Sequence, residues 1–133
     1  MIFNAGPGEL FIVRTAGNVV GTYEIGSLEY AVNALYAPLV VVLGHQQCGA
    51  VKAAVSGKDY SPNLNAVLNE IRCCCELEFL KGDISEIEDK NIRYTLSKIA
   101  ANENISKAVS QGAVRLLAAK YSLETGIVNF FDF

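Results

Sequence analysis

The chain has 133 residues and a mass of 14.3 kDa, enough for one domain with a single buried core. Hydrophobic residues make up 51% of it and the mean hydropathy is +0.27, which excludes a disordered chain, because such chains bury too little apolar surface to offset the entropy of ordering. The net charge of −3 and the pI near 5.1 exclude the basic surface expected of a protein that binds nucleic acid or an anionic membrane.

The sequence also predicts a soluble, cytoplasmic protein. The longest apolar run, residues 37–44, is far too short to span a bilayer, and the first residues carry no signal-peptide pattern. Three of the four cysteines are consecutive, Cys73-Cys74-Cys75, and neighbouring helical side chains point in different directions. They therefore suit no disulfide framework, and a reducing compartment is expected.

The first third of the chain predicts a turn, a strand and a helix. Glycine-rich residues 4–9 form the turn, and the short apolar run 10–14 follows as a strand. The strand ends at Ala16-Gly17-Asn18. Residues 24–36 then carry apolar side chains at helical spacing, with Ser27 as the candidate cap.

The middle of the chain predicts a buried strand and a short helix. Residues 39–43 are a continuous, mostly β-branched run, typical of a parallel strand that is buried on both faces. It stops at Gly44-His45, and a helix over residues 48–55 follows, ended by Ser56-Gly57.

The last half predicts two long helices and a strand pair. Residues 63–79 form one helix, and residues 87–111 another that is broken near Glu103-Asn104. Residues 114–121 and 127–131 are two closing strands joined by a turn. Because strands and helices alternate, the predicted class is α/β with a largely parallel sheet flanked by helices.

The residues that point to chemistry are His45 and Cys48. Ligands of open parallel sheets bind outside the carboxyl ends of the strands, where His45 is placed. Cys48 begins the next helix, where the helix dipole and free N–H groups favour a thiolate. An imidazole and a thiolate three residues apart can share a zinc ion. A loop histidine beside a small buried thiol is the alternative interpretation.

Four blocks of this sequence resemble β-class carbonic anhydrases in order and spacing. They are GPGELFIVR at residues 6–14, AGN at 16–18, GSLEYAV at 26–32 and VLGHQQCGAV at 42–51. The resemblance continues through residues 91–93 to the final strand pair, so it covers essentially the whole chain as a single domain over residues 1–133.

The resemblance implies a zinc lyase that interconverts carbon dioxide and bicarbonate. That family holds zinc with two cysteines and one histidine, and His45 and Cys48 match the histidine and the second cysteine. Zinc lowers the pKa of a bound water toward about 7, and the hydroxide formed attacks CO2. Four further positions match the family's substrate pocket: Phe11, Ala16, Tyr30 and Gly49. The Gly49 N–H would face the bound oxygens. For the two aromatic residues, ordinary core packing is the alternative.

One motif of the family is absent from this chain. The first zinc cysteine belongs to a Cys-x-Asp-Ser-Arg motif that precedes the segment with which this chain opens. A zinc ligand, an aspartate beside the metal and its paired arginine are therefore missing, and the resemblance assigns no further catalytic residue here. Replacement by one of residues 73–75 is not expected, because their helical register favours core packing.

The absent motif also implies a missing strand. In the family it lies between the strands that match residues 10–14 and 39–43, so its loss leaves a gap of about twice the usual 4.8 Å strand spacing. Unpaired edges of this kind invite closure, a swapped strand or aggregation. Met1 stands where the family has an internal apolar residue, and the hypothesis is that the chain is an N-terminally truncated product, a mis-assigned start or a fragment.

Three functions remain open at this stage. The first is a carbonic anhydrase whose isolated chain has impaired activity, and a related zinc hydrolase of carbon disulfide or carbonyl sulfide would share its motifs. A non-catalytic binding or assembly module that kept the scaffold is the alternative from another class. The expected partners are a small-molecule substrate and a second copy of the chain in a homodimer or higher homo-oligomer, with no nucleic acid and no membrane.

Overall fold

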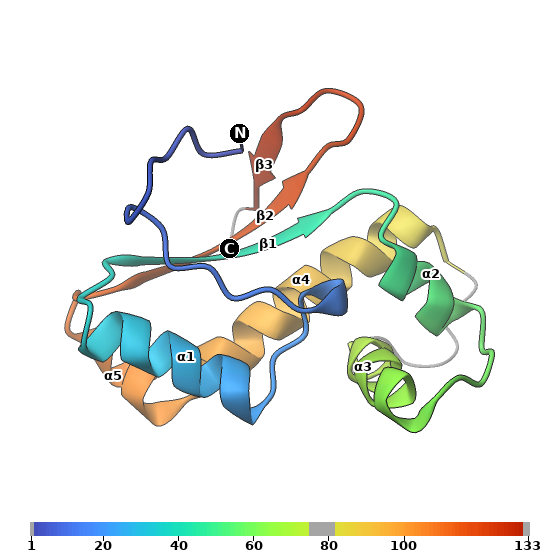
Figure 1. The fold of residues 1–133 in the computed structure, drawn as a ribbon, viewed down its shortest axis with the longest axis horizontal. Coiled ribbons are helices and arrows are strands. Elements are labelled where there is room, and N and C mark those ends of the chain that lie inside the picture. Colours follow the sequence, from blue (N-terminus) through green and yellow to red (C-terminus); the bar gives the residue numbers. More distant parts are fainter. Residues whose placement is uncertain (1, 75–81, 132–133) are drawn as a thin grey trace.

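The computed structural model describes residues 2–74 and 82–131. Within these ranges a small mixed sheet is flanked by helices (Figure 1), which confirms the predicted α/β class. None of the described helices combines the length and apolar character needed to cross a membrane. In chain order the elements are the 3-10 turn η1 (Ala16–Asn18), α1 (Thr22–Asn33), β1 (Leu39–His45), α2 (Gly49–Val55), α3 (Pro62–Arg72), α4 (Ile84–Ala100), α5 (Glu103–Ser110), β2 (Arg115–Tyr121) and β3 (Val128–Phe130).

The sheet has the strand order β1-β2-β3. β1 and β2 are parallel, in a register that pairs Leu39 with Arg115 and His45 with Tyr121. β3 returns antiparallel to β2, with Ala119 opposite Phe130, which confirms the predicted closing strand pair. The carboxyl ends of β1 and β2 therefore lie side by side at one edge of the sheet.

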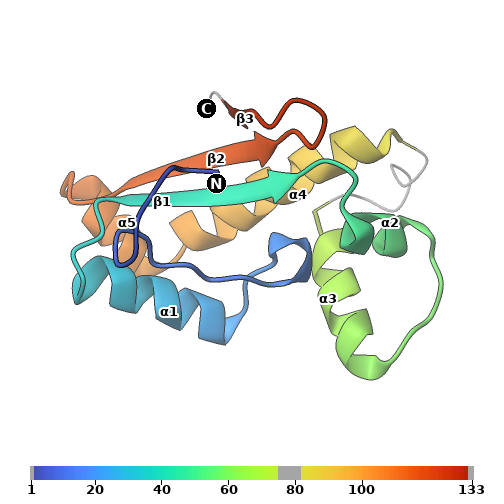
Figure 2. The ribbon, with the colours of Figure 1, turned by 45° about the horizontal axis from the view of Figure 1, so that its top comes forward.

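The predicted burial of β1 on both faces is wrong. Val40, Val42 and Gly44 are buried, whereas Val41 and Leu43 between them are only half-buried. Figure 2 shows the reason, because α1, α4 and α5 lie together on the same side of β1 and β2. One face of the strand is covered and the other is only partly covered.

The strand predicted over residues 10–14 does not form. This segment is extended but pairs with no strand of the described chain, and Leu10, Phe11 and Ile12 are 48%, 48% and 67% exposed. Among the described residues β1 pairs only with β2, so its other edge has no strand partner. A β-strand exists only when a neighbour satisfies its backbone, and none of the described strands pairs with residues 10–14.

Side chains that satisfy free backbone groups mark the helix ends, but the predicted cap of the first helix is wrong. The predicted cap Ser27 lies inside α1, where its hydroxyl donates to the Tyr23 carbonyl oxygen at 2.7 Å. The helix begins instead at Thr22, and its N-cap is Gly21, whose N–H donates to the Glu24 carboxylate at 2.9 Å. Pro62 opens α3, which ends at Arg72, and residues 75–79 of the predicted helix lie outside the described residues.

The break predicted in the last long helix is confirmed. Asn102 separates α4 from α5, and its side-chain oxygen accepts from the N–H groups of Asn104 and Ile105, each at 3.1 Å. This is an N-cap, which satisfies N–H groups that have no partner within the helix. A new helix, α5, therefore starts after Asn102.

Two buried clusters matter for the site. One joins β1 and β2 to α4 and α5 through Val42, Ala118, Ile92, Leu96 and Ile105. The other joins α2, α3 and the start of α4, and Cys48 belongs to it together with Val51, Ala54, Leu68, Ile71 and Ile87.

Core packing of the cysteine triplet is only partly observed. Cys73 caps the end of α3 and is exposed, which corrects the expectation that it packs in the core. Cys74 is half-buried against the cluster that contains Leu68 and Ile71. Cys75 lies outside the described residues.

Candidate metal centre

His45 and Cys48 line one cleft at the carboxyl end of β1. His45 is the last residue of that strand, and Cys48 is the N-cap of α2. The cleft has a volume of about 370 Å³. Its lining comes from the end of the extended N-terminal segment, η1, the end of β1 and the start of α2: Arg14, Thr15, Ala16, Gly17, His45, Cys48, Gly49 and Ala50.

The exposed imidazole of His45 is oriented by its own loop. Its Nδ1 lies 2.8 Å from the carbonyl oxygen of Gln46. A carbonyl oxygen can only accept, so in the neutral ring this contact selects the tautomer with the proton on Nδ1 and the lone pair on Nε2. A hydrogen bond from one ring nitrogen to a carbonyl is the usual way in which proteins prepare the other nitrogen as a metal ligand.

Cys48 is a free thiol that is only 5% exposed. Its backbone N–H donates to Oε1 of Glu88 at 2.9 Å, across 40 residues of sequence. The bond ties the first turn of α2 to α4.

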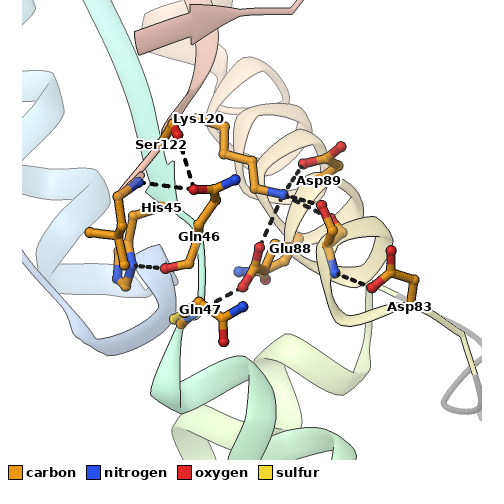
Figure 3. A network of polar contacts seen from close by, with 12 residues as sticks. His45, Gln46, Gln47, Asp83, Glu88, Asp89, Lys120 and Ser122 are labelled. Carbon is orange, nitrogen blue, oxygen red and sulfur yellow. Dashed lines mark hydrogen bonds and ion pairs between the residues drawn. The ribbon is translucent and has the colours of Figure 1, made fainter. Parts of the chain in front are cut away.

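Glu88 is itself buried and paired with a buried lysine. It is 3% exposed, and its Oε2 lies 3.0 Å from Nζ of Lys120 on β2. The same ammonium lies 2.8 Å from Asp89 and donates to the carbonyl oxygen and hydroxyl of Ser85 at 3.0 and 2.8 Å. Figure 3 shows Lys120 reaching from β2 to these side chains on α4.

The charge of Lys120 is stabilised despite its burial. Burial by itself lowers the pKa of this ammonium, but hydrogen bonds and the negative charges of Asp89 and Glu88 outweigh it. The net result is a pKa above the ordinary lysine value of 10.5. Lys120 therefore stays charged and keeps Glu88 in place.

The loop between the two candidate ligands is held at its other end by Gln46. The Gln46 N–H donates to the Tyr121 carbonyl oxygen at 3.0 Å. The Gln46 side-chain oxygen accepts from the Ser122 hydroxyl at 3.0 Å (Figure 3) and from the Leu123 N–H at 2.9 Å. Between Gln46 and Cys48, Gln47 takes a φ of +57°, a left-handed conformation that turns the chain sharply. The turn brings His45, the last residue of β1, and Cys48, the N-cap of α2, to the same cleft.

The structure separates the four expected pocket residues into two pairs. Ala16 and Gly49 line the cleft with His45 and Cys48. Phe11 and Tyr30 contact each other, with ring centroids 6.3 Å apart, and are 48% and 55% exposed. Neither aromatic residue is among those that line this cleft.

Sequence reasoning missed Glu88, Lys120 and Arg14. Lys120 carried a signal, because a charge that follows four apolar residues in a predicted strand needs a buried partner. Glu88 stands directly after the buried Ile87 in α4, on the covered side of that helix. Arg14 carried no signal beyond its charge.

The side chains of His45 and Cys48 are of the types that bind zinc, but there are fewer of them than a catalytic zinc site requires. A neutral imidazole and a thiolate are both zinc ligands, whereas catalytic sites have three protein ligands and an open position. In residues 2–74 and 82–131, no group of three or more histidine, cysteine, aspartate or glutamate side chains is placed to hold a metal ion. At this cleft the described residues offer two candidate ligands, His45 and Cys48.

Comparison with known proteins identifies the family. The carbonic anhydrase family model matches residues 1–128. Carbonic anhydrase 2 of Mycobacterium tuberculosis is 32% identical over 133 residues, which cover 95% of this chain and 64% of that protein. The carbonic anhydrase of Mycolicibacterium smegmatis is 33% identical over 136 residues, covering 97% and 66%. The chain thus spans just under two thirds of the length of these relatives.

Solved structures agree on the fold. The β-carbonic anhydrase CcaA superimposes with a TM-score of 0.82 at 27% identity, covering 98% of this chain and 66% of that one. The β-carbonic anhydrase CafA of Aspergillus fumigatus gives a TM-score of 0.90 at 23% identity, covering 98% and 67%. Family model, relatives and fold coincide over nearly the whole sequence, and the chain belongs to the β-carbonic anhydrase family.

Proposed function

We propose that this protein catalyses the zinc-dependent, reversible hydration of carbon dioxide to bicarbonate. The observation that carries the proposal is that His45 and Cys48 line one cleft at the carboxyl end of β1, with Nε2 of His45 left as a lone-pair donor. Zinc, when bound by these two residues and a third ligand, supplies a water of lowered pKa as the nucleophile.

The chain's own groups have separate roles in this proposal. His45 and Cys48 hold the metal, and the cleft admits the substrate past Ala16. The N–H of Gly49 is the first of α2 and has no partner within the helix, so it can donate to an oxygen of bicarbonate. Arg14, at the cleft wall, adds the positive charge that attracts this anion. Phe11 and Tyr30 complete the apolar side of the substrate pocket in the assembled enzyme.

The activity of the 133-residue chain by itself is proposed to be low. The described residues provide two zinc ligands, and metal affinity falls steeply when a ligand is lost. The aspartate and arginine that the resemblance places beside the metal are also absent from this sequence.

Metal analysis and stopped-flow CO2 hydration test the proposal on the purified chain. Zinc is expected in the wild type, in reduced amount or absent in His45→Ala and Cys48→Ser, and unchanged in the control Cys73→Ser, since Cys73 is exposed at the end of α3. Turnover is expected to be weak and to vanish in both ligand variants. Zinc content that does not depend on His45 or Cys48 would refute the site.

A non-catalytic binding or assembly module is the second candidate. The lack of a three-residue ligand group among the described residues favours it. A wild-type chain that binds no zinc and hydrates no CO2, yet unfolds cooperatively, would establish this alternative. Hydrolysis of carbon disulfide or carbonyl sulfide, measured beside CO2 hydration, distinguishes the related hydrolases.

We also propose that the chain forms a homo-oligomer in the cytoplasm. One structural neighbour, from Sordaria macrospora, is described as tetrameric; its TM-score is 0.89 at 20% identity, and the match covers 99% of this chain and 73% of that one. The exposed apolar side chains of residues 10–12 supply surface for such contacts. The cytoplasmic location is supported by the free cysteines Cys48 and Cys73, because reducing compartments keep thiols free. Sedimentation velocity and cell fractionation test these two statements.

A further inference from the structure

A buried glutamate holds the backbone of a candidate zinc ligand. Oε1 of Glu88 accepts the Cys48 N–H at 2.9 Å, and Oε2 pairs with Lys120 at 3.0 Å. Each carboxylate oxygen therefore has its own partner, one on α2 and one on β2.

Stability alone does not explain this arrangement. Taking a carboxylate and an ammonium out of water is costly, and well-packed apolar residues of similar size commonly serve as well or better. Glu88 and Lys120 are 3% and 8% exposed, so both pay this desolvation cost. An apolar residue at position 88 lacks one thing that the glutamate provides, an acceptor for the Cys48 N–H.

The loop that carries both candidate ligands is fixed at two points. Gln46 ties its start to the end of β2 through Tyr121 and Ser122. Glu88 ties its end, at Cys48, to α4. With the turn at Gln47 between these points, the relative position of the imidazole and the thiol depends on both.

We infer that Glu88 is a positioning residue for Cys48. Its carboxylate, held by Lys120, fixes the amide of Cys48 and thereby keeps the sulfur at the cleft that His45 also lines. The link to zinc rests on the proposed function, whereas the hold on the amide is independent of any metal.

The test compares two double variants that differ only in the acceptor. Glu88→Gln/Lys120→Met and Glu88→Met/Lys120→Met both remove the two charges and keep similar side-chain volumes, but only the glutamine can accept the Cys48 N–H. Each is made with Cys73, Cys74 and Cys75 replaced by serine, so that Cys48 is the single thiol. Asp89→Asn is the control, since it changes another partner of Lys120 without touching Cys48.

Two readouts need no metal: hydrogen exchange of the Cys48 amide and alkylation of its thiol by iodoacetamide. Both rates are expected to stay near wild type in the glutamine variant and in the control, and to rise about tenfold or more in the methionine variant through local opening. Equal rates in the two double variants would overturn the inference. If the methionine variant fails to fold, Glu88→Gln and Glu88→Met with Lys120 retained form the same comparison.

Zinc affinity, measured by competition with a chromogenic chelator, completes the test. We expect a loss of about 10–100-fold in the methionine variant, as for other groups that orient metal ligands, and little change in the glutamine variant. Equal affinity in both, despite a released amide, would overturn the positioning role and leave the proposed function intact. A wild type that binds no zinc would refute the proposed function, while the two metal-free readouts still decide whether Glu88 holds Cys48.

Discussion

The Cγ1 atom of Ile92 lies 2.5 Å from the point that a Cβ on Gly44 would occupy. Real Cβ contacts are essentially never shorter than 3.0 Å, so α4 approaches β1 as closely as it does only because residue 44 has no side chain. Gly44 directly precedes His45. This contact therefore sets the distance between the helix that carries Glu88 and the strand that carries the candidate zinc ligand.

Gly44→Ala is expected to destabilise the fold by about 1–3 kcal/mol, because the added methyl group overpacks the contact with Ile92. Urea unfolding measures the change. The control is Gly26→Ala in α1, where a new Cβ meets nothing within 4 Å, and it should stabilise the protein by about 0.5–1 kcal/mol. A Gly44→Ala variant as stable as wild type would show that α4 can move without cost.

Asn91→Ala is expected to cost about 1–3 kcal/mol of unfolding free energy. The Asn91 side chain is buried, and its amide donates to the Gly17 carbonyl oxygen at 2.7 Å, which joins α4 to the 3-10 turn beside the cleft. Its removal leaves that carbonyl without this partner. Asn63→Ala, at an exposed position of α3, is the control and should change stability by less than about 0.5 kcal/mol in the same urea experiment.

The sequence was sufficient wherever a local signal determines the structure. The run of β-branched residues at 40–42 predicts β1, and the hydrogen bonds that the Asn102 side chain accepts explain why α4 and α5 are separate helices. The placement of His45 at a strand end and Cys48 at a helix start follows from the same local patterns. Each of these features can be predicted from a few neighbouring residues.

The failures share a different cause. Residues 10–14 have the composition of a strand, but strand formation depends on a neighbour, and none of the described strands lies beside them. Ser27 has the chemistry of a cap, but Glu24 already satisfies the N–H of Gly21 one turn earlier.

The contacts that hold Cys48 in place could not be predicted from the sequence, for a related reason. Glu88 on α4 reaches Cys48 across 40 residues, and Lys120 reaches Glu88 from β2. No spacing rule joins such positions, because the fold alone decides which faces of α4 and β2 meet. The sequence indicates such a buried ion pair only through a charged residue inside an apolar strand, as at Lys120.

Glu29→Gln is expected to destabilise the protein at pH 7 and to match wild type in acid. Hydrogen bonds from Asn104 and Asn102, at 2.9 and 3.0 Å, hold the pKa of Glu29 below its ordinary value of 4.5. A lowered pKa in the folded state adds stability above the unfolded value, and this stability is lost as the pH falls through the folded value. Urea midpoints of both proteins between pH 7 and pH 2 should converge below 4.5. A gap that persists in acid would contradict this explanation.

Lys120→Met is expected to cost about 3 kcal/mol, because it leaves the buried carboxylate of Glu88 without its charge partner. The pKa of Lys120 is raised above 10.5, so its contribution is complete below the unfolded value and is lost only as the pH rises through the folded value. The loss measured by urea unfolding should therefore be the same at pH 7 and at pH 9. The exposed Lys107→Met serves as control, with a change below about 0.5 kcal/mol. A loss that shrinks between pH 7 and pH 9 would mean that Lys120 is not held charged.

Ile12→Lys is expected to reduce self-association without changing the fold. Ile12 is 67% exposed in an extended segment that pairs with no described strand, and such segments promote association between chains. A lysine there adds charge where no packing is lost, so the unfolding free energy should change by less than about 0.5 kcal/mol. Light scattering at increasing protein concentration measures the association. Ile127→Lys is the matched control, since Ile127 is 57% exposed but belongs to the turn before β3 rather than to the N-terminal segment. An equal drop in scattering for both variants would assign the effect to net charge rather than to the unpaired N-terminal segment.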